Sequence, residues 1–152
     1  MRISHVKVRV IAYDWDDPGE LKKKLLEFLK GLPEEELEKI QIRETKGTGL
    51  ISTFLTVYEL NLKNRRQILT FLKNLIEKLT SLDDLYKNIN YDEDYSMYIR
   101  LDKDLLVNKN IARPVYARDV FHIKISFNMP HKTKEKVLDE FKSIINKLVQ
   151  EK

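Results

Sequence analysis

The sequence predicts an α+β fold in which helices cover one face of a mostly antiparallel sheet. Three segments carry apolar residues at helical spacing along one stripe each, and three others alternate apolar and polar residues with the period of a strand. Elements with one apolar face bury it most simply against one another, so the helices are expected on one side of the sheet. The predicted order is β-α-β-β-α-β-β-α, within a single domain spanning residues 1–152.

A strand and a helix open the chain. Over residues 5–12, valines and an alanine alternate with His, Lys, Arg and Ile, which predicts a strand with one buried face. Asp17 is placed as the N-cap of a helix, because a proline follows it directly and an acid stands three residues later. Gly31 and Pro33 are typical of a helix end, so the helix is expected to stop there.

A β-hairpin is predicted next. After an acidic turn at residues 34–39, residues 40–45 form its first arm, and residues 46–49 supply glycines for the connection. The second arm, residues 50–60, is apolar at both alternating positions near its middle. That pattern favours an interior strand covered on at least one side.

The second half of the chain predicts two amphipathic helices and two strands, with a weaker pattern between the first helix and the first of these strands. Asn64 caps a helix with a clear apolar stripe, whereas residues 80–95 indicate only a short helix and an acidic loop rich in tyrosine. Strict alternation predicts strands at residues 97–101 and 121–127. A final amphipathic helix is expected to begin near Thr133.

Composition excludes several classes of protein. The chain has no cysteine, so it cannot form disulfides, thiolate metal sites or a cysteine nucleophile. It also lacks an apolar run of the roughly 18 residues that would span a bilayer, and its N-terminus lacks the order of a signal peptide. We expect a cytoplasmic protein that is not an enzyme, uses no cofactor or metal and does not enter the membrane.

The strand pattern places basic and aromatic side chains on the face opposite the helices. If the apolar positions face the helices, the alternate positions point the other way. These are His5, Lys7, Arg9, Tyr13, Gln41, Arg43, Tyr98, Arg100, His122 and Lys124, without an acid among them, although Asp102 follows at the same alternating position on the margin. Because a solvated face normally mixes both charge signs, a face of one sign indicates an anionic partner. Cations neutralise phosphates and planar rings stack on unpaired bases, so RNA is the favoured partner.

Positive charge is also concentrated outside the strands. The net charge of +4 is modest, but residues 105–118 contain Lys109, Arg113 and Arg118 and no acid. Lys46 stands at the hairpin turn, where it is a further candidate phosphate contact.

Several segments resemble an archaeal family described as RNA-binding proteins and predicted exosome-associated subunits, whose fold is similar to the ribosomal protein that binds 5S RNA. The similar segments are residues 3–13, 44–49, 100–104 and 119–125, followed by a terminal helix. The resemblance implies RNA association without known catalysis. The positions that match the family are Arg100, Asp102 and Lys103.

The candidate RNA contacts combine the open face, the basic segment and the resemblance. They are His5, Lys7, Arg9, Arg43, Lys46, Tyr98, Arg100, Lys103, Lys109, Arg113, Arg118, His122 and Lys124.

Two other functions compete with RNA binding. One is an adaptor for an acidic protein, which would also use a basic face. The other is a metal-dependent nuclease that would use the acidic cluster Asp14, Asp16 and Asp17, although helix capping already explains Asp17. Proteins of an RNA-processing or translation complex are further expected partners. Neither strand order nor oligomeric state follows from the pattern.

Overall fold

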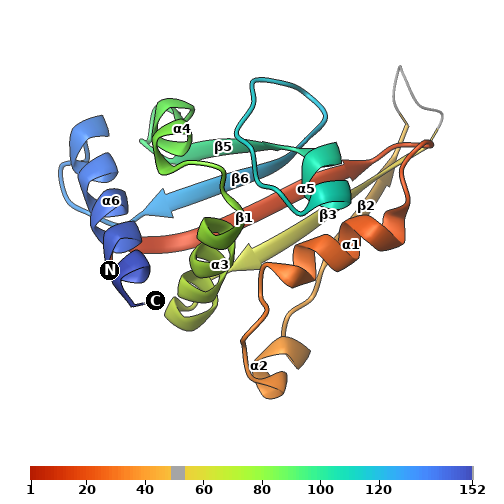
Figure 1. Ribbon diagram of the computed structural model, residues 1–152, viewed down its shortest axis with the longest axis horizontal. Helices are drawn as coiled ribbons and strands as arrows, with labels where there is room; N and C mark the ends of the chain where they lie inside the picture. Colours follow the sequence, from red (N-terminus) through yellow and green to blue (C-terminus); the bar gives the residue numbers. More distant parts are fainter. Residues whose placement is uncertain (49–53, 152) are drawn as a thin grey trace.

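The computed structural model describes residues 1–48 and 54–151, shown in Figure 1. Within these residues the strands are β1 (Ile3–Ala12), β2 (Arg43–Gly47), β3 (Leu55–Leu62), β4 (Asn90–Tyr91), β5 (Met97–Asp102) and β6 (Val120–Phe127). The helices are α1 (Pro18–Glu27), α2 (Glu34–Glu38), α3 (Arg65–Lys78), α4 (Leu82–Lys87), α5 (Lys103–Lys109) and α6 (Lys134–Gln150).

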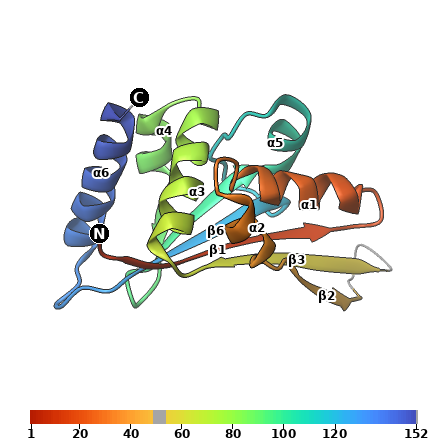
Figure 2. The same cartoon turned by 90° about the horizontal axis from the view of Figure 1, so that it is seen from below.

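The strands form one sheet in the order β2-β3-β1-β6-β5-β4, and every neighbouring pair is antiparallel. Figure 2 shows α1, α3, α4, α5 and α6 on one side of this sheet, and Figure 1 shows α2 at the lower end of the view, away from the other helices. Within the described part of the chain, the other side carries no helix. The predicted α+β fold is therefore confirmed.

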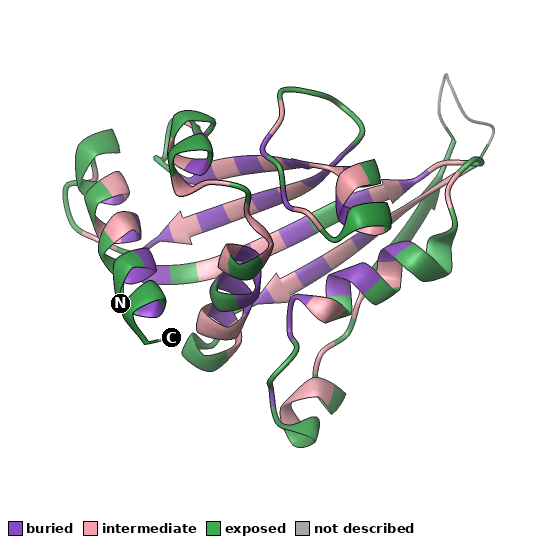
Figure 3. Cartoon of the chain, in the orientation of Figure 1, coloured by how far each residue is buried: buried purple, intermediate pink, exposed green. Residues whose placement is uncertain are grey.

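The core lies between the sheet and the helices. Figure 3 shows buried and more exposed residues alternating along the central strands, as pleating requires. Val8, Leu60, Ile99 and Ile123 come from four different strands and are all fully buried. Full burial of each such side chain stabilises the fold by about 1.5–3 kcal/mol relative to exposure. The largest fully buried rings are Phe28, Phe71, Phe121 and Phe141.

Three predicted helix starts are confirmed by their caps. The side chains of Asp17, Asn64 and Thr133 each accept a hydrogen bond from the backbone N–H three residues later, at 3.4, 2.9 and 3.2 Å respectively. These bonds satisfy donors that have no partner inside the helix. The cap residues therefore set where α1, α3 and α6 begin.

Other boundaries differ from the predictions. α1 ends at Glu27, and the following turns lead to Gly31, whose φ of 105° suits glycine. The buried amide of Asn74 donates to the carbonyls of Phe28 and Lys30, at 2.7 and 2.9 Å, which satisfies backbone groups that a longer helix would have paired. The acidic segment predicted as a turn forms α2 instead.

The predicted hairpin lies partly outside the described residues, which omit Gly49 and residues 50–53. Its first arm begins at Arg43 rather than at residue 40. The second arm, β3, is an interior strand between β2 and β1 and is covered on one side, as expected. Along it Glu59 and Asn61 alternate with the buried side chains of Tyr58, Leu60 and Leu62. An apolar run just before Glu59 hid this alternation in the sequence.

α5 is a helix that the pattern did not predict. Asp102 caps it by accepting a bond from the Leu105 N–H at 2.9 Å, and Asn110 ends it with a φ of 56°. Asparagine tolerates this left-handed conformation better than most residues. α5 thus interrupts the basic segment and leaves residues 110–119 to return to the sheet at β6.

Among the described residues, no helix has both the length and the apolar character needed to cross a membrane.

Candidate nucleic-acid interface

The open face of the sheet brings the predicted basic side chains together in two cross-strand rows. In one row Arg9 of β1 pairs with His122 of β6, which pairs with Arg100 of β5. In the next row Lys7 pairs with Lys124, which pairs with Tyr98. We call Lys7, Arg9, Tyr98, Arg100, His122 and Lys124 the basic face. Adjacent rows lie about 7 Å apart along the strands.

The cations of the basic face have no carboxylate partner in the described structure. The ion pairs there join Lys22 to Glu44, Lys24 to Glu27, and Lys103 to Asp16 and Asp119, and none includes a residue of the basic face. Like charges on neighbouring strands destabilise the sheet, as at the Lys7–Lys124 pair. An anion bound across the rows would relieve this repulsion.

The expectation of an open face without acids needs a correction. Glu59 of β3 lies on this face between Arg9 and Arg43, with which it pairs in register. Its Oε1 accepts a hydrogen bond from the Asn61 amide at 3.1 Å rather than an ion pair from either arginine. The negative charge of Glu59 therefore lies toward the β2 edge, beside the basic face.

Planar rings lie among these cations. The Tyr98 ring centroid is 5.7 Å from Nζ of Lys124 and 5.2 Å from the His122 ring. The Tyr98 hydroxyl donates to Asp92 at 2.9 Å, which holds the ring in place. Such rings, partly exposed beside positive charge, are suited to stacking against bases next to bound phosphates.

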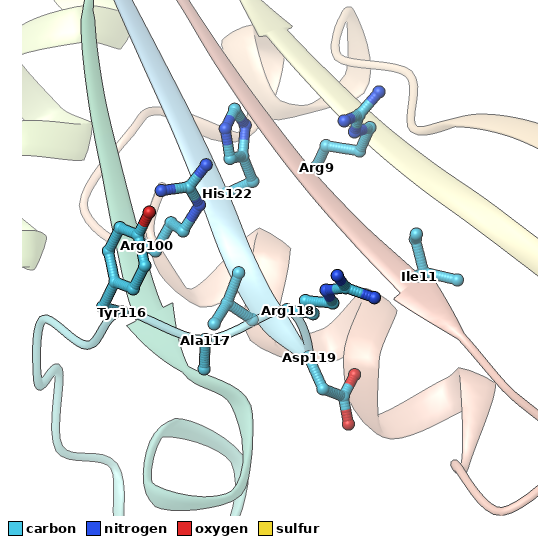
Figure 4. Close-up of a pocket in the computed structure, with 9 residues that line it drawn as sticks. Arg9, Ile11, Arg100, Tyr116, Ala117, Arg118, Asp119 and His122 are labelled. Atoms are coloured by element: carbon cyan, nitrogen blue, oxygen red, sulfur yellow. The ribbon is translucent and has the colours of Figure 1, made fainter. Parts of the chain in front are cut away.

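A pocket of about 550 Å³ opens where the basic face meets the segment before β6. Figure 4 shows Arg9, Arg100 and His122 on the strands and Tyr116 to Asp119 on that segment. Tyr116 is 88% exposed, and Cζ of Arg100 lies 5.7 Å from the centroid of its ring. Ile11 and Val120 add apolar surface to the lining.

The pKa of His122 is lowered by burial and by the positive charges around it. Burial is the main cause that lowers its pKa, to about 4, and the charges of Arg9, Arg100 and Lys124 lower it further. The imidazole is therefore neutral near pH 7 and can donate or accept a hydrogen bond without adding to the charge.

The sequence places this geometry within a known family. The model of a family described as RNA binding matches residues 5–127, which include the whole basic face and the pocket. The chain belongs to this RNA-binding family. Three DUF54 proteins of solved structure share the fold of this family member. A search of curated proteins found no match to the chain.

The solved structures show how far that fold extends. Mth689 from Methanothermobacter thermautotrophicus is 20% identical, with a TM-score of 0.72 over 95% of this chain and 99% of that one. AF2318 from Archaeoglobus fulgidus is also 20% identical, with a TM-score of 0.72 over 94% and 99%. SSO0741 from Sulfolobus solfataricus is 19% identical, with a TM-score of 0.68 over 91% and 98%. At these identities the likeness shows the fold alone.

The structure of this RNA-binding family member removes Lys103 from the candidate contacts. Its side chain is only 3% exposed. The ammonium donates to the Ile11 carbonyl at 2.7 Å and to Asp16 at 2.9 Å, and it also pairs with Asp119. A lysine held in this way joins β1, the turn before α1 and the segment before β6, so its role is structural.

Asp16 and Asp17 of the acidic cluster accept hydrogen bonds that stabilise the fold. Asp16 also accepts a bond from the Tyr13 N–H at 2.9 Å, and Asp17 caps α1. Across residues 1–48 and 54–151, no group of three or more histidines and acids is placed to hold a metal ion. Hydrogen bonding explains the position of Asp16, and helix capping explains that of Asp17.

The remaining predicted contacts fall at several places. His5 and Arg43 lie on the open face, and His5 Nε2 is 3.1 Å from the Asn61 side-chain oxygen. Burial lowers the pKa of His5 more than this hydrogen bond raises it. Lys46 alternates with Arg43 on β2 and so points to the other side of the sheet, while Lys109 ends α5.

Two residues near the pocket show what sequence reasoning found and what it missed. Arg118 was predicted and lines the pocket, whereas Arg113 is exposed beside β5, where its carbonyl accepts a bond from the Asp102 N–H. Tyr116 lines the pocket but was not predicted. Its position between two arginines in an acid-free segment was a usable signal.

Proposed function

We propose that this chain is a non-catalytic RNA-binding protein that holds RNA across the basic face. The observation that carries the proposal is the pair of cross-strand rows, in which four cations without carboxylate partners in the described structure surround two planar rings. Membership of an RNA-binding family supports RNA as the anion.

The rings favour RNA with unpaired bases over a regular duplex. In a duplex the base faces are stacked on one another, so rings such as Tyr98 and Tyr116 can reach them only where the strand is open. Backbone phosphates would contact Lys7, Arg9, Arg100 and Lys124, and the rings would stack against the bases between them.

The salt dependence of binding tests this proposal. If about four phosphates are neutralised, log affinity for a single-stranded RNA should fall against log salt with a slope near −3. Fluorescence anisotropy at several salt concentrations measures the slope, with poly-glutamate as a competitor of equal charge. No binding at low salt would overturn the proposal, and equal competition by poly-glutamate would favour the protein adaptor instead.

Labelled RNA recovered after incubation with Mg²⁺ or Mn²⁺ should be intact, and shortened products would contradict the non-catalytic assignment.

The setting that we propose is a cytoplasmic RNA-processing or translation complex, as the sequence resemblance to exosome-associated proteins suggests. Sedimentation of a cell extract checks this setting. The chain should migrate with exosome or ribosomal fractions and return to the top of the gradient after RNase treatment if RNA mediates the association. Migration at the top before treatment would contradict the setting but not RNA binding itself.

A further inference from the structure

The pocket next to the basic face combines positive charge and an exposed ring in one place. We propose that it receives a terminal phosphate monoester of an RNA strand, with the base of the end nucleotide stacked on Tyr116. This inference rests on the proposed function, because the remainder of the strand would lie across the basic face.

Three guanidinium groups line the pocket, and they come from separate parts of the chain. Arg9 belongs to β1, Arg100 to β5 and Arg118 to the segment before β6. None of the three makes an ion pair in the described structure. Among the described residues of the lining, Asp119 is the one acid; it pairs with Lys103, and Figure 4 shows its carboxylate directed away from Arg9 and His122. The pocket therefore presents positive charge that the protein itself does not neutralise.

A terminal phosphate fits this charge better than an internal one. A phosphate monoester carries about −1.5 to −2 charges near pH 7 and has three unesterified oxygens, whereas an internal diester carries a single charge. Guanidinium groups bind such oxygens through paired N–H donors, so several arginines can share one monoester. Three arginines around one pocket thus favour the end of a strand.

The position of the pocket also suits a strand end. Arg9, His122 and Arg100 form the row that borders the pocket, and the row of Lys7, Lys124 and Tyr98 follows along the same strands. On the other side, residues 116–119 bound the pocket. A strand anchored by its terminal phosphate would therefore leave the pocket toward Lys7 and Lys124.

The exposed tyrosine supplies the second part of the site. Arg100 lies beside the Tyr116 ring while also lining the pocket, so one side chain touches both the phosphate and the stacking surface. Stacking of one base on an aromatic ring contributes about 1–3 kcal/mol in single-strand binding, which corresponds to a roughly 5- to 150-fold gain. The end nucleotide can be held by its phosphate and its base together.

Three RNAs of one sequence test the inference. One has a 5′-phosphate, one a 3′-phosphate and one hydroxyl groups at both ends. We expect at least one phosphorylated form to bind about tenfold more tightly than the hydroxyl form, because a terminal phosphate adds charge-assisted hydrogen bonds. The form that gains shows which end the pocket takes.

Arg118→Ala provides the decisive comparison. Arg118 is exposed and lies outside the strands, so its replacement should leave the fold intact. The ratio of phosphorylated to hydroxyl affinity should fall toward one in this variant. Arg66→Ala, which removes the same charge at an exposed position of α3 on the other side of the sheet, should keep the ratio of the unchanged protein.

The possible results separate the two proposals. Equal affinity for all three RNAs, or a preference that Arg118→Ala retains, would overturn the terminal-phosphate site while leaving RNA binding intact. Failure of every RNA to bind would instead reject the proposed function.

An NMR titration adds a readout in the pocket, since the pKa of His122, about 4 in the free protein, should rise when the phosphorylated end is bound. An unchanged His122 pKa in the saturated complex would also overturn the site.

Discussion

Replacing Arg9, Arg100 and Lys124 together by alanine should weaken RNA binding by about a hundredfold or more at low salt. Each side chain lies in the two rows of the basic face, and none has a carboxylate partner in the described structure to compensate its loss. Removal of three phosphate contacts should also make the salt slope about 2 units shallower. Anisotropy titrations of the variant at several salt concentrations measure both effects.

The matched control removes the same charge from the opposite side of the molecule. Arg65, Arg66 and Lys73 are exposed on α3, so their joint replacement by alanine lowers the net charge by the same three units. Its RNA affinity should stay within a fewfold of the unchanged protein. Equal losses in the two triple variants would show that overall charge, rather than the basic face, determines binding. Thermal unfolding of both variants should confirm that the fold is kept.

Lys103→Met should destabilise the protein by about 3 kcal/mol. The substitution leaves the Asp16 carboxylate, only 12% exposed, and the Ile11 carbonyl without the donor that both now share. A buried charge that loses its partner keeps the full cost of its desolvation. Asp119 contributes less to this loss, because it is 46% exposed and water can replace its partner. Urea unfolding followed by circular dichroism measures the change.

An exposed lysine serves as the comparison for Lys103. Lys23 lies on the solvent side of α1, and Lys23→Met should change the free energy of unfolding by no more than about 0.5 kcal/mol. A loss below about 1 kcal/mol in Lys103→Met would contradict the structural role assigned to this lysine. A lysine that contacts RNA and little else would give that small loss.

Residues 100–104, one of the segments on which the sequence resemblance rests, have different roles in the structure. Arg100 lies on the basic face, Asp102 caps α5, and Lys103 is buried beneath the pocket segment. The resemblance matched these three residues together, while the strand pattern independently selected Arg100. Pleating directs Arg100 outward, while the start of α5 turns Lys103 toward the interior.

The sequence by itself determined which side of β1, β5 and β6 faces the helices and where α1, α3 and α6 begin. These features are local, since alternation follows from the pleat and a cap bonds to an N–H three residues away. It therefore also predicted that Lys7, Arg9, Arg100 and Lys124 share the open face. α5 was missed because its cap and its left-handed end are single-residue signals in a segment without a long apolar stripe.

Only the tertiary structure decided which strands are neighbours. β1 pairs with β6 across more than a hundred residues of chain, and that pairing places Arg9 beside His122 and Arg100. The same packing buried Lys103, brought Tyr116 to Arg100 and set Glu59 beside Arg9. Local periodicity carries no information about such pairings, because many strand orders bury the same apolar faces equally well.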